Sequence, residues 1–254
     1  MKALIALALL GAAVPAGASA AEVHLRDVIA EVRIIPEARG DFAVSIANAH
    51  PGLPQMRVSR TASGVLVDGG LHRRLNSCGM MSGIKVKNGP TVSKKNLPRI
   101  TIRAPQNFAV RASGYVRGQI GAAQAVKLNA EGCGDWGIGQ TSQRLEIDVE
   151  GVSHIDAASA RSADLSLEGV GDIDLASVNG ALDASVEGVG HIRVKAGRAT
   201  AMRARLEGMG GIRFDGVADT LDASAEGIGS INVPNTRTVL RKSLDGLAKI
   251  RTSR

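Results

Sequence analysis

The residues of this sequence that could carry out chemistry recur at a regular interval and do not gather in a compact motif. Seven acidic residues, each followed by glycine, are spaced 19, 18, 19, 20, 19 and 19 residues apart: Glu131, Glu150, Glu168, Glu187, Glu207, Glu226 and Asp245. Carboxylates can hold a cation, and a pair of them can act as general acid and base. A spacing this regular instead indicates stacked units, in which equivalent residues form a column.

A column of seven carboxylates needs something to offset its own repulsion. Parallel strands stack about 4.8 Å apart, and like charges at that spacing destabilise a sheet. We expect a structural acid column, in which each carboxylate accepts backbone N–H bonds at the corner that follows it, as a capping residue does. The alternative is a ladder of Ca²⁺ ions shared between units.

Histidine offers a second candidate for metal binding. His154, Asp172 and His191 take the same position in three successive units. Two imidazoles and a carboxylate could bind Zn²⁺, but the two histidines would lie about 10 Å apart, which is two strand spacings. We therefore expect an exposed polar column, and the sequence predicts no metal site and no cofactor.

Catalytic motifs are missing from the sequence. It contains no Gly-x-Ser-x-Gly elbow, no His-Glu-x-x-His pair and no phosphate-binding loop. Enzymes that cleave polysaccharides on a β-helix need converging acids in a groove, and sugar-binding grooves commonly carry aromatic residues. This chain has one Trp, one Tyr and three Phe. The sequence favours a non-catalytic protein, and the alternative is a periplasmic glycan-acting hydrolase or lyase on a β-helix scaffold.

Each repeated unit reads as a strand, a glycine corner and a second strand. Leu182–Glu187 alternates apolar and polar residues, Gly188-Val189-Gly190 frees the backbone for a corner, and His191–Val194 alternates again. No helical period is visible. The pattern predicts an all-β fold, a right-handed parallel β-helix or β-solenoid with rungs of about 19 residues.

Two apolar positions recur in the units, and we expect both to point inward. The first is held by Trp136, Ile155, Ile173, Ile192, Ile212, Ile231 and Ile250. The second directly follows the first corner glycine and is held by Cys133, Val152, Val170, Val189, Met209, Ile228 and Leu247.

The chain divides into three segments. Residues 1–20 combine a basic start, a short apolar run and the small-residue site Ala18-Ser19-Ala20, which predicts a secretory signal peptide cleaved after Ala20. Residues 21–127 read as an irregular β segment with Ser113 in the acid's place; its strands before residue 98 are either wider N-terminal rungs of the same domain or a small capping sheet. Residues 128–254 are the regular solenoid repeats. No later apolar run is long enough to span a bilayer, so we expect a periplasmic or secreted protein without a transmembrane segment after cleavage.

The only two cysteines, Cys78 and Cys133, are a candidate disulfide. An oxidising compartment favours pairing, but the sequence leaves open whether the two Cα atoms come within reach of each other.

Positive charge is concentrated before the repeats. Residues 69–130 contain 11 basic residues and no acidic one. A candidate anion-binding patch within this stretch comprises Arg73, Arg74, Lys85, Lys87, Lys94 and Lys95. Its partner would be an anionic envelope component or another protein, and the alternative is a solvated face. Nucleic acid is not expected, because the chain is exported and has few aromatic residues for base stacking.

The glycine turns also resemble a known family. Gly169–Ile173 reads G-V-G-D-I and Gly227–Asn232 reads G-I-G-S-I-N, after an irregular β segment with a proline-to-valine step at Pro105–Val110. With the signal peptide, these features resemble the putative auto-transporter adhesin head GIN domain, over roughly residues 28–250. The resemblance implies an exported β-helical head with no catalytic residues to transfer. We therefore expect a structural, adhesion or interaction role at the cell envelope.

Overall fold

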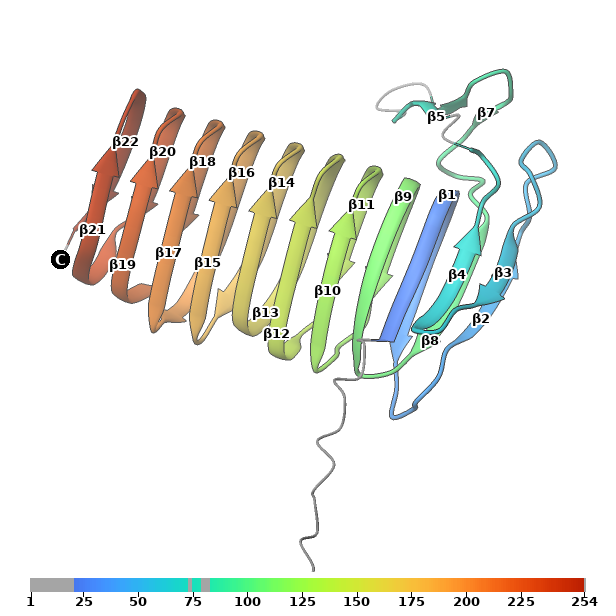
Figure 1. The fold of residues 1–254 in the computed structure, drawn as a ribbon, viewed down its shortest axis with the longest axis horizontal. Coiled ribbons are helices and arrows are strands. Elements are labelled where there is room, and N and C mark those ends of the chain that lie inside the picture. Colours follow the sequence, from blue (N-terminus) through green and yellow to red (C-terminus); the bar gives the residue numbers. More distant parts are fainter. Residues whose placement is uncertain (1–20, 73–74, 79–82, 254) are drawn as a thin grey trace, which may run out of the picture.

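The computed structural model describes residues 21–72, 75–78 and 83–253. These residues form strands and turns without a helix, stacked along one axis as the rungs of a solenoid (Figure 1). The predicted all-β solenoid is confirmed. No helix with the length and hydrophobicity to cross a bilayer is found in the described part of the chain.

The regular rungs each place strands on both sides of a glycine corner. Their strands are β10 (Ala125–Ala130), β11 (Cys133–Ile138), β12 (Thr141–Val149), β13 (Val152–Leu167), β14 (Val170–Val178), β15 (Ala181–Val186), β16 (Val189–Ala199), β17 (Ala201–Leu206), β18 (Met209–Phe214), β19 (Val217–Ala225), β20 (Ile228–Val233), β21 (Asn235–Leu244) and β22 (Leu247–Thr252). All pair in parallel with the rung before. Leu145 lies opposite Ala163, 18 residues on, and Leu182 opposite Met202, 20 residues on. The sequence period is therefore the register of the sheet.

One continuous apolar core fills the stack. The predicted isoleucine column is buried, with Ile155 fully inaccessible and Ile250 only 7% exposed. Trp136 takes the same position in the first unit and is also buried. The tube is filled mainly by aliphatic residues, as expected from the scarcity of aromatic residues.

Strand β1 (Ala21–Pro36) lies inside the stack although it is the first described strand of the chain. It pairs in parallel with β4 (Gly64–Asp68) and β8 (Arg99–Ala104) on one side, and with β9 (Asn107–Ile120) on the other. Figure 1 shows β1 in blue between cyan β4 and green β9. The rungs before the repeats are therefore assembled from segments that lie far apart in the sequence.

Two further features complete this end of the molecule. Strands β2 (Ala43–Ala47) and β3 (Arg57–Arg60) run antiparallel to β8 and β4 and cover the outer edge of the first rung. The chain between β4 and β8 forms a separate small sheet of β5 (Leu75–Ser77), β6 (Ile84–Val86) and β7 (Thr91–Val92). We call this segment, residues 69–98, the insertion; it stands beyond one edge of the stack (Figure 1).

Candidate functional site

The seven acids lie in one column along a corner edge of the solenoid. The backbone N–H of Glu168 donates to Val149 O and that of Glu187 to Leu167 O, both at 2.9 Å. Each acid therefore starts its corner directly beside the corner of the preceding rung. The Ser113 position extends this column into β9, because the N–H of Glu131 donates to Ala112 O at 3.0 Å.

Glycine is required at the first position of these corners because neighbouring rungs approach closely there. A Cβ atom on Gly188 would overlap the carbonyl oxygen of Gly169 in the rung below. Gly190 has a φ of 149°, a conformation that L side chains rarely adopt. The Gly-x-Gly pattern thus serves rung stacking.

The predicted backbone cap of the carboxylates is wrong for most corners. It forms at Asp245, whose Oδ1 accepts the N–H of Gly246 at 2.8 Å. Elsewhere the stacked rung takes the corner donors: the N–H of Gly188 donates to Leu167 O at 3.0 Å, and that of Val189 to Gly169 O at 2.9 Å. The carboxylates are therefore left to project outward.

Most of the column carries uncompensated charge. Arg111 Nε lies 2.6 Å from Glu131 Oε1. The next six acids are exposed, and none of them forms an ion pair with another described side chain: Glu150, Glu168, Glu187, Glu207, Glu226 and Asp245. This edge is consequently a strip of negative charge.

The acids influence one another's protonation. Nearby Asp148 raises the pKa of Glu168 most strongly, and slight desolvation and the stacked Glu187 and Glu150 add to this shift. Like charges at neighbouring rungs disfavour ionisation of the central one. The repulsion that was expected from the sequence is therefore present in the folded chain.

The apolar residue after the first corner glycine points outward, so the prediction that it points inward is wrong. Exposed fractions along this position are 47% at Val170, 43% at Val189, 51% at Met209, 54% at Ile228 and 76% at Leu247. Strict alternation explains the error. Counted back in twos from buried Ile192, the inward side reaches Gly190 and leaves Val189 on the outer side.

The insertion is tied to this edge. Cys78 and Cys133 form a disulfide, with their Cα atoms 5.6 Å apart. Tyr115 of β9 and Ile29 of β1, the stacked equivalents of Cys133, are buried under the insertion. The insertion contributes Leu71, Ile84, Val86, Val92 and Leu97 to this second apolar cluster.

The candidate basic patch lies on the insertion. Lys85, Lys87 and Lys95 are exposed. The Nζ atom of Lys94 lies 5.5 Å from the ring centroid of Tyr115, a cation–π contact. Arg73 and Arg74 lie outside the described residues.

The insertion and the corner edge enclose a groove of about 750 Å³. His24, Arg26 and Arg111 line it together with Glu131 and the insertion's Leu75. Sequence reasoning missed the contribution of β1, because no repeat signal links residues 24–26 to the unit that begins at residue 128.

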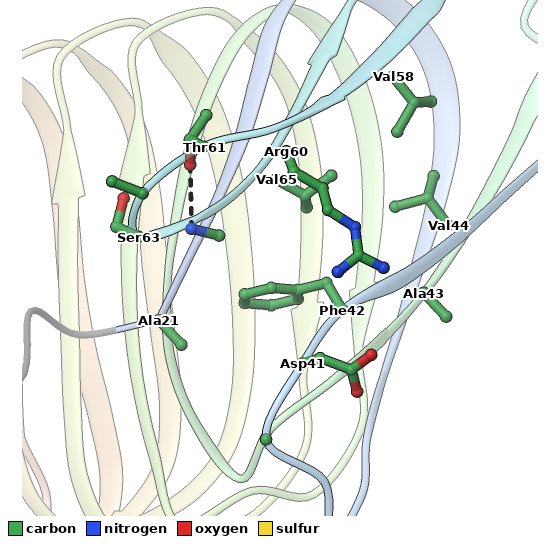
Figure 2. A pocket seen from close by; sticks show the side chains of 13 residues that line it. Ala21, Asp41, Phe42, Ala43, Val44, Val58, Arg60, Thr61, Ser63 and Val65 are labelled. Atoms are coloured by element: carbon green, nitrogen blue, oxygen red, sulfur yellow. Dashed lines mark hydrogen bonds between the residues drawn. The ribbon is translucent and has the colours of Figure 1, made fainter.

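A second, smaller pocket of about 500 Å³ opens at the end of the stack between β2 and β3 (Figure 2). Phe42, Val44 and Arg60 line it. Its one carboxylate, Asp41, accepts hydrogen bonds from Arg39, which keep the pKa of Asp41 low. A carboxyl group held ionised in this way is unsuited to act as a general acid.

The two histidines of the predicted polar column contact different carboxylates. His191 Nδ1 lies 3.3 Å from Asp172 Oδ1, and His154 Nε2 lies 3.2 Å from Asp156 Oδ2. Both histidines are exposed, whereas Asp172 between them is half-buried, so the expected exposure of this column holds at the histidines.

A different trio places three ligand-type atoms within 4.8 Å of one another: His154, Asp156 and Asp174. Arg193 and Lys195 each lie 3.7 Å from Asp174. Since two cations already neighbour the largely buried Asp174 side chain, the arrangement is an ion-pair cluster.

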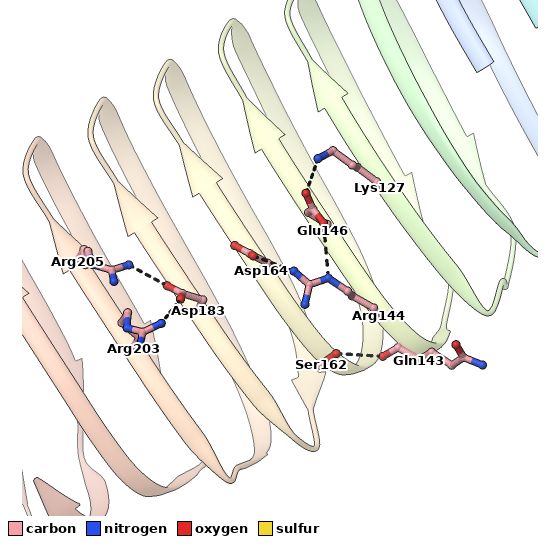
Figure 3. Close-up of polar contacts among 9 residues, drawn as sticks. All are labelled: Lys127, Gln143, Arg144, Glu146, Ser162, Asp164, Asp183, Arg203 and Arg205. Atoms are coloured by element: carbon pink, nitrogen blue, oxygen red, sulfur yellow. Dashed lines mark hydrogen bonds and ion pairs between the residues drawn. The ribbon is translucent and has the colours of Figure 1, made fainter. Parts of the chain in front are cut away.

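A mixed-charge column runs down another face of the rungs. In register, Glu146 lies opposite Asp164, and Asp183 lies opposite Arg203. Arg144 donates to Asp164 and Arg203 donates to Asp183, each at 3.0 Å (Figure 3). Exposed pairs of this kind contribute about 0–1 kcal/mol each, so they add little to the stability of the stack.

Comparison with known proteins finds one matching family model and two crystal structures of the same fold. Residues 82–197 match the family described as "Putative auto-transporter adhesin, head GIN domain". The fold is shared with the crystal structure of a putative adhesin from Bacteroides fragilis, at 18% identity and a TM-score of 0.59 over 92% of each chain. A putative adhesin from Parabacteroides distasonis is similar at 16% identity and a TM-score of 0.56, over 92% of this chain and 93% of the other. No curated protein matches. The resemblance seen in the glycine turns is thus confirmed: residues 82–197 match the model of the head GIN domain family.

Proposed function

We propose that the chain is an exported, non-catalytic β-solenoid module with an adhesion or interaction role at the cell envelope. The observation that carries this proposal is the row of exposed apolar side chains beside the acid column, from Val170 to Leu247. Soluble proteins rarely expose apolar side chains in a contiguous row unless the row meets a partner.

The solenoid suits such a role mechanically. Its backbone bonds run between stacked rungs, and its side chains repeat in columns at a fixed spacing of about 4.8 Å. A rigid surface loses little conformational entropy on binding. The family description and the two adhesin structures of the same fold support an adhesion module.

The basic surface of the insertion provides a separate contact for an anionic envelope component. Lys85, Lys87 and Lys95 project into solvent from the segment that covers the edge. Contacts between such lysines and phosphate or carboxylate groups weaken as salt is added.

The proposal is tested by giving the purified exported protein to isolated envelope fractions and, in parallel, to a panel of glycans. We expect the protein to be retained on the envelope fractions and to turn over none of the glycans. Replacing Lys85, Lys87, Lys94 and Lys95 with serine distinguishes the basic surface of the insertion from the row of exposed apolar side chains. Salt-sensitive retention should fall in this variant if the insertion makes the contact. Glycan turnover without envelope retention would reject the proposal.

The alternative is a glycan-acting hydrolase or lyase, and one pair of acids gives it a concrete location. Partial burial and the neighbouring Asp183 raise the pKa of Asp164, although Arg144 opposes this shift. Glycosidases use a carboxyl group with a raised pKa beside a second carboxylate. However, Arg203 and Arg205 both hold Asp183, which favours an ion-pair network. If turnover is found, D164N should abolish it.

A further inference from the structure

The outward apolar residues form part of a longer ladder that crosses nine rungs. Its members pair in register, each with the next: Ile29, Tyr115, Cys133, Val152, Val170, Val189, Met209, Ile228 and Leu247. We call this ladder the corner ridge. All nine positions are equivalent in the fold, so they present the same kind of surface.

The chain itself covers the first three positions of the ridge. Ile29 and Tyr115 are 1% and 2% exposed beneath the insertion, and Cys133 is joined to it by the disulfide. The covering strand β6 alternates aliphatic and basic residues: Ile84 and Val86 are buried, while Lys85 between them is exposed. The fold thus shows that a segment of alternating aliphatic and basic residues can cover this ridge, with its aliphatic side chains packed inward.

The remaining positions have no such cover in the described structure. Exposure rises to between 43% and 76% from Val170 to Leu247. These rungs, with Val152, extend the ridge by about 24 Å at five strand spacings. The exposed part is continuous with the covered part, since Cys133 pairs directly with Val152.

Charge distinguishes the partners that this exposed part can accept. The six unpaired acids from Glu150 to Asp245 stand two residues before the exposed ridge positions. A second copy placed ridge against ridge would bring two acid columns together, and an anionic lipid surface would be repelled. A cationic partner would relieve the repulsion that already raises the pKa of Glu168.

We propose that the exposed corner ridge and its acid column bind a cationic segment of a partner protein in which aliphatic residues alternate with lysine or arginine. The segment would continue, in trans, the cover that the insertion supplies in cis. This inference rests on the proposed interaction role and names the chemistry of its partner.

The test uses the purified exported protein and a synthetic peptide with the sequence of residues 83–97, which carries four lysines and no acid. Calorimetric titration measures binding of this peptide. A second peptide with glutamate in place of the four lysines controls for charge.

Three protein variants locate the binding surface. The ridge variant is Val189→Ser, Met209→Ser and Ile228→Ser. The column variant is Glu187→Gln, Glu207→Gln and Glu226→Gln. The matched control replaces three exposed acids outside the column: Asp41→Asn, Asp156→Asn and Asp215→Asn. All substituted side chains are exposed, and unchanged melting curves verify that each variant folds.

The proposal expects the lysine peptide to bind, with affinity reduced about tenfold or more in the ridge and column variants and unchanged in the control variant. Binding should also weaken as salt is added. No binding of the lysine peptide, equal binding of the glutamate peptide, or equal affinity in the ridge variant would overturn it. Sedimentation in which the wild type dimerises and the ridge variant does not would overturn it in favour of a second copy. Envelope retention that survives the ridge substitutions would reject this inference while leaving the proposed function standing.

Discussion

At the scale of single residues, a methyl group decides whether two corners can stack. Gly188 has no room for a Cβ atom against Gly169, whereas Gly40, in a turn, has nothing within 4 Å of that position. We expect Gly188→Ala to lower the free energy of unfolding by about 1–3 kcal/mol, because the rungs must separate to admit the methyl group. Gly40→Ala should leave stability within about 1 kcal/mol of the wild type. Urea unfolding of both variants measures this difference. Equal midpoints would show that the rungs leave room for a methyl group at Gly188.

Protonation provides a second test at this scale. Burial raises the pKa of Asp148, and its Oδ1 has no hydrogen-bond partner among the described residues. The folded state therefore holds this proton more tightly than the unfolded chain, so stability falls as pH rises from the unfolded pKa through the raised folded pKa. We expect Asp148→Asn to raise the melting temperature at neutral pH, and the gain to vanish below about pH 3.9.

Asp68 should show the opposite behaviour. A hydrogen bond from Arg26, at 2.6 Å, and one from the backbone of Gly70 lower the pKa of Asp68. Its stabilising effect is present above the unfolded pKa and is lost as pH falls through the folded pKa. Asp68→Asn should therefore lower the melting temperature at neutral pH, with a difference that shrinks in acid. Thermal melts of both variants across this range provide the comparison, and parallel curves for the two would contradict the assignment.

At the scale of elements, the insertion is a cover held by an apolar cluster and one disulfide. The bridge closes a sequence separation of 55 residues. We expect Cys78→Ser to cost about 2–4 kcal/mol and to loosen the insertion before the rungs, which keep their own backbone ladders. Hydrogen exchange should accelerate around β6 and β7 while β14 and β16 stay protected. Uniform acceleration would mean that the insertion and the stack unfold as one unit.

The parts of this arrangement that could be predicted are those that repeat. A register such as Leu182 opposite Met202 follows from the period alone, because the units are near copies of one another. The position of β1 could not be predicted, since Val23 pairs with Val65 and Val110, which share no repeat signal with it. The outward direction of Val189 follows from the alternation of the strand that contains Ile192. It was not predicted because Gly190, the inward residue between them, has no side chain that would mark the inward side.

At the scale of the whole molecule, the last described rung differs from the rungs stacked before it. Lys242 stands opposite Ala223, in a column whose earlier members are buried. A register shift in the same pair of strands leaves Leu240 unpaired and 67% exposed. An inward-facing charge and a bulge are both known to block further strand addition at an edge.

Removing these features should therefore promote end-to-end association. We expect Lys242→Ala combined with deletion of Leu240 to associate in a concentration-dependent manner in sedimentation velocity experiments. The control is Lys249→Ala, which changes an exposed lysine of the same rung that does not occupy a core column. A monomeric double variant would show that the end is protected by something else.

The central claim is that the corner ridge faces outward and receives a partner, and cysteine labelling tests it most directly. Met209→Cys should react with a maleimide as an exposed thiol does, Ile212→Cys should stay protected, and the peptide of residues 83–97 should slow labelling at position 209 alone. A protected thiol at position 209, or a labelling rate there that the peptide leaves unchanged, would contradict the account.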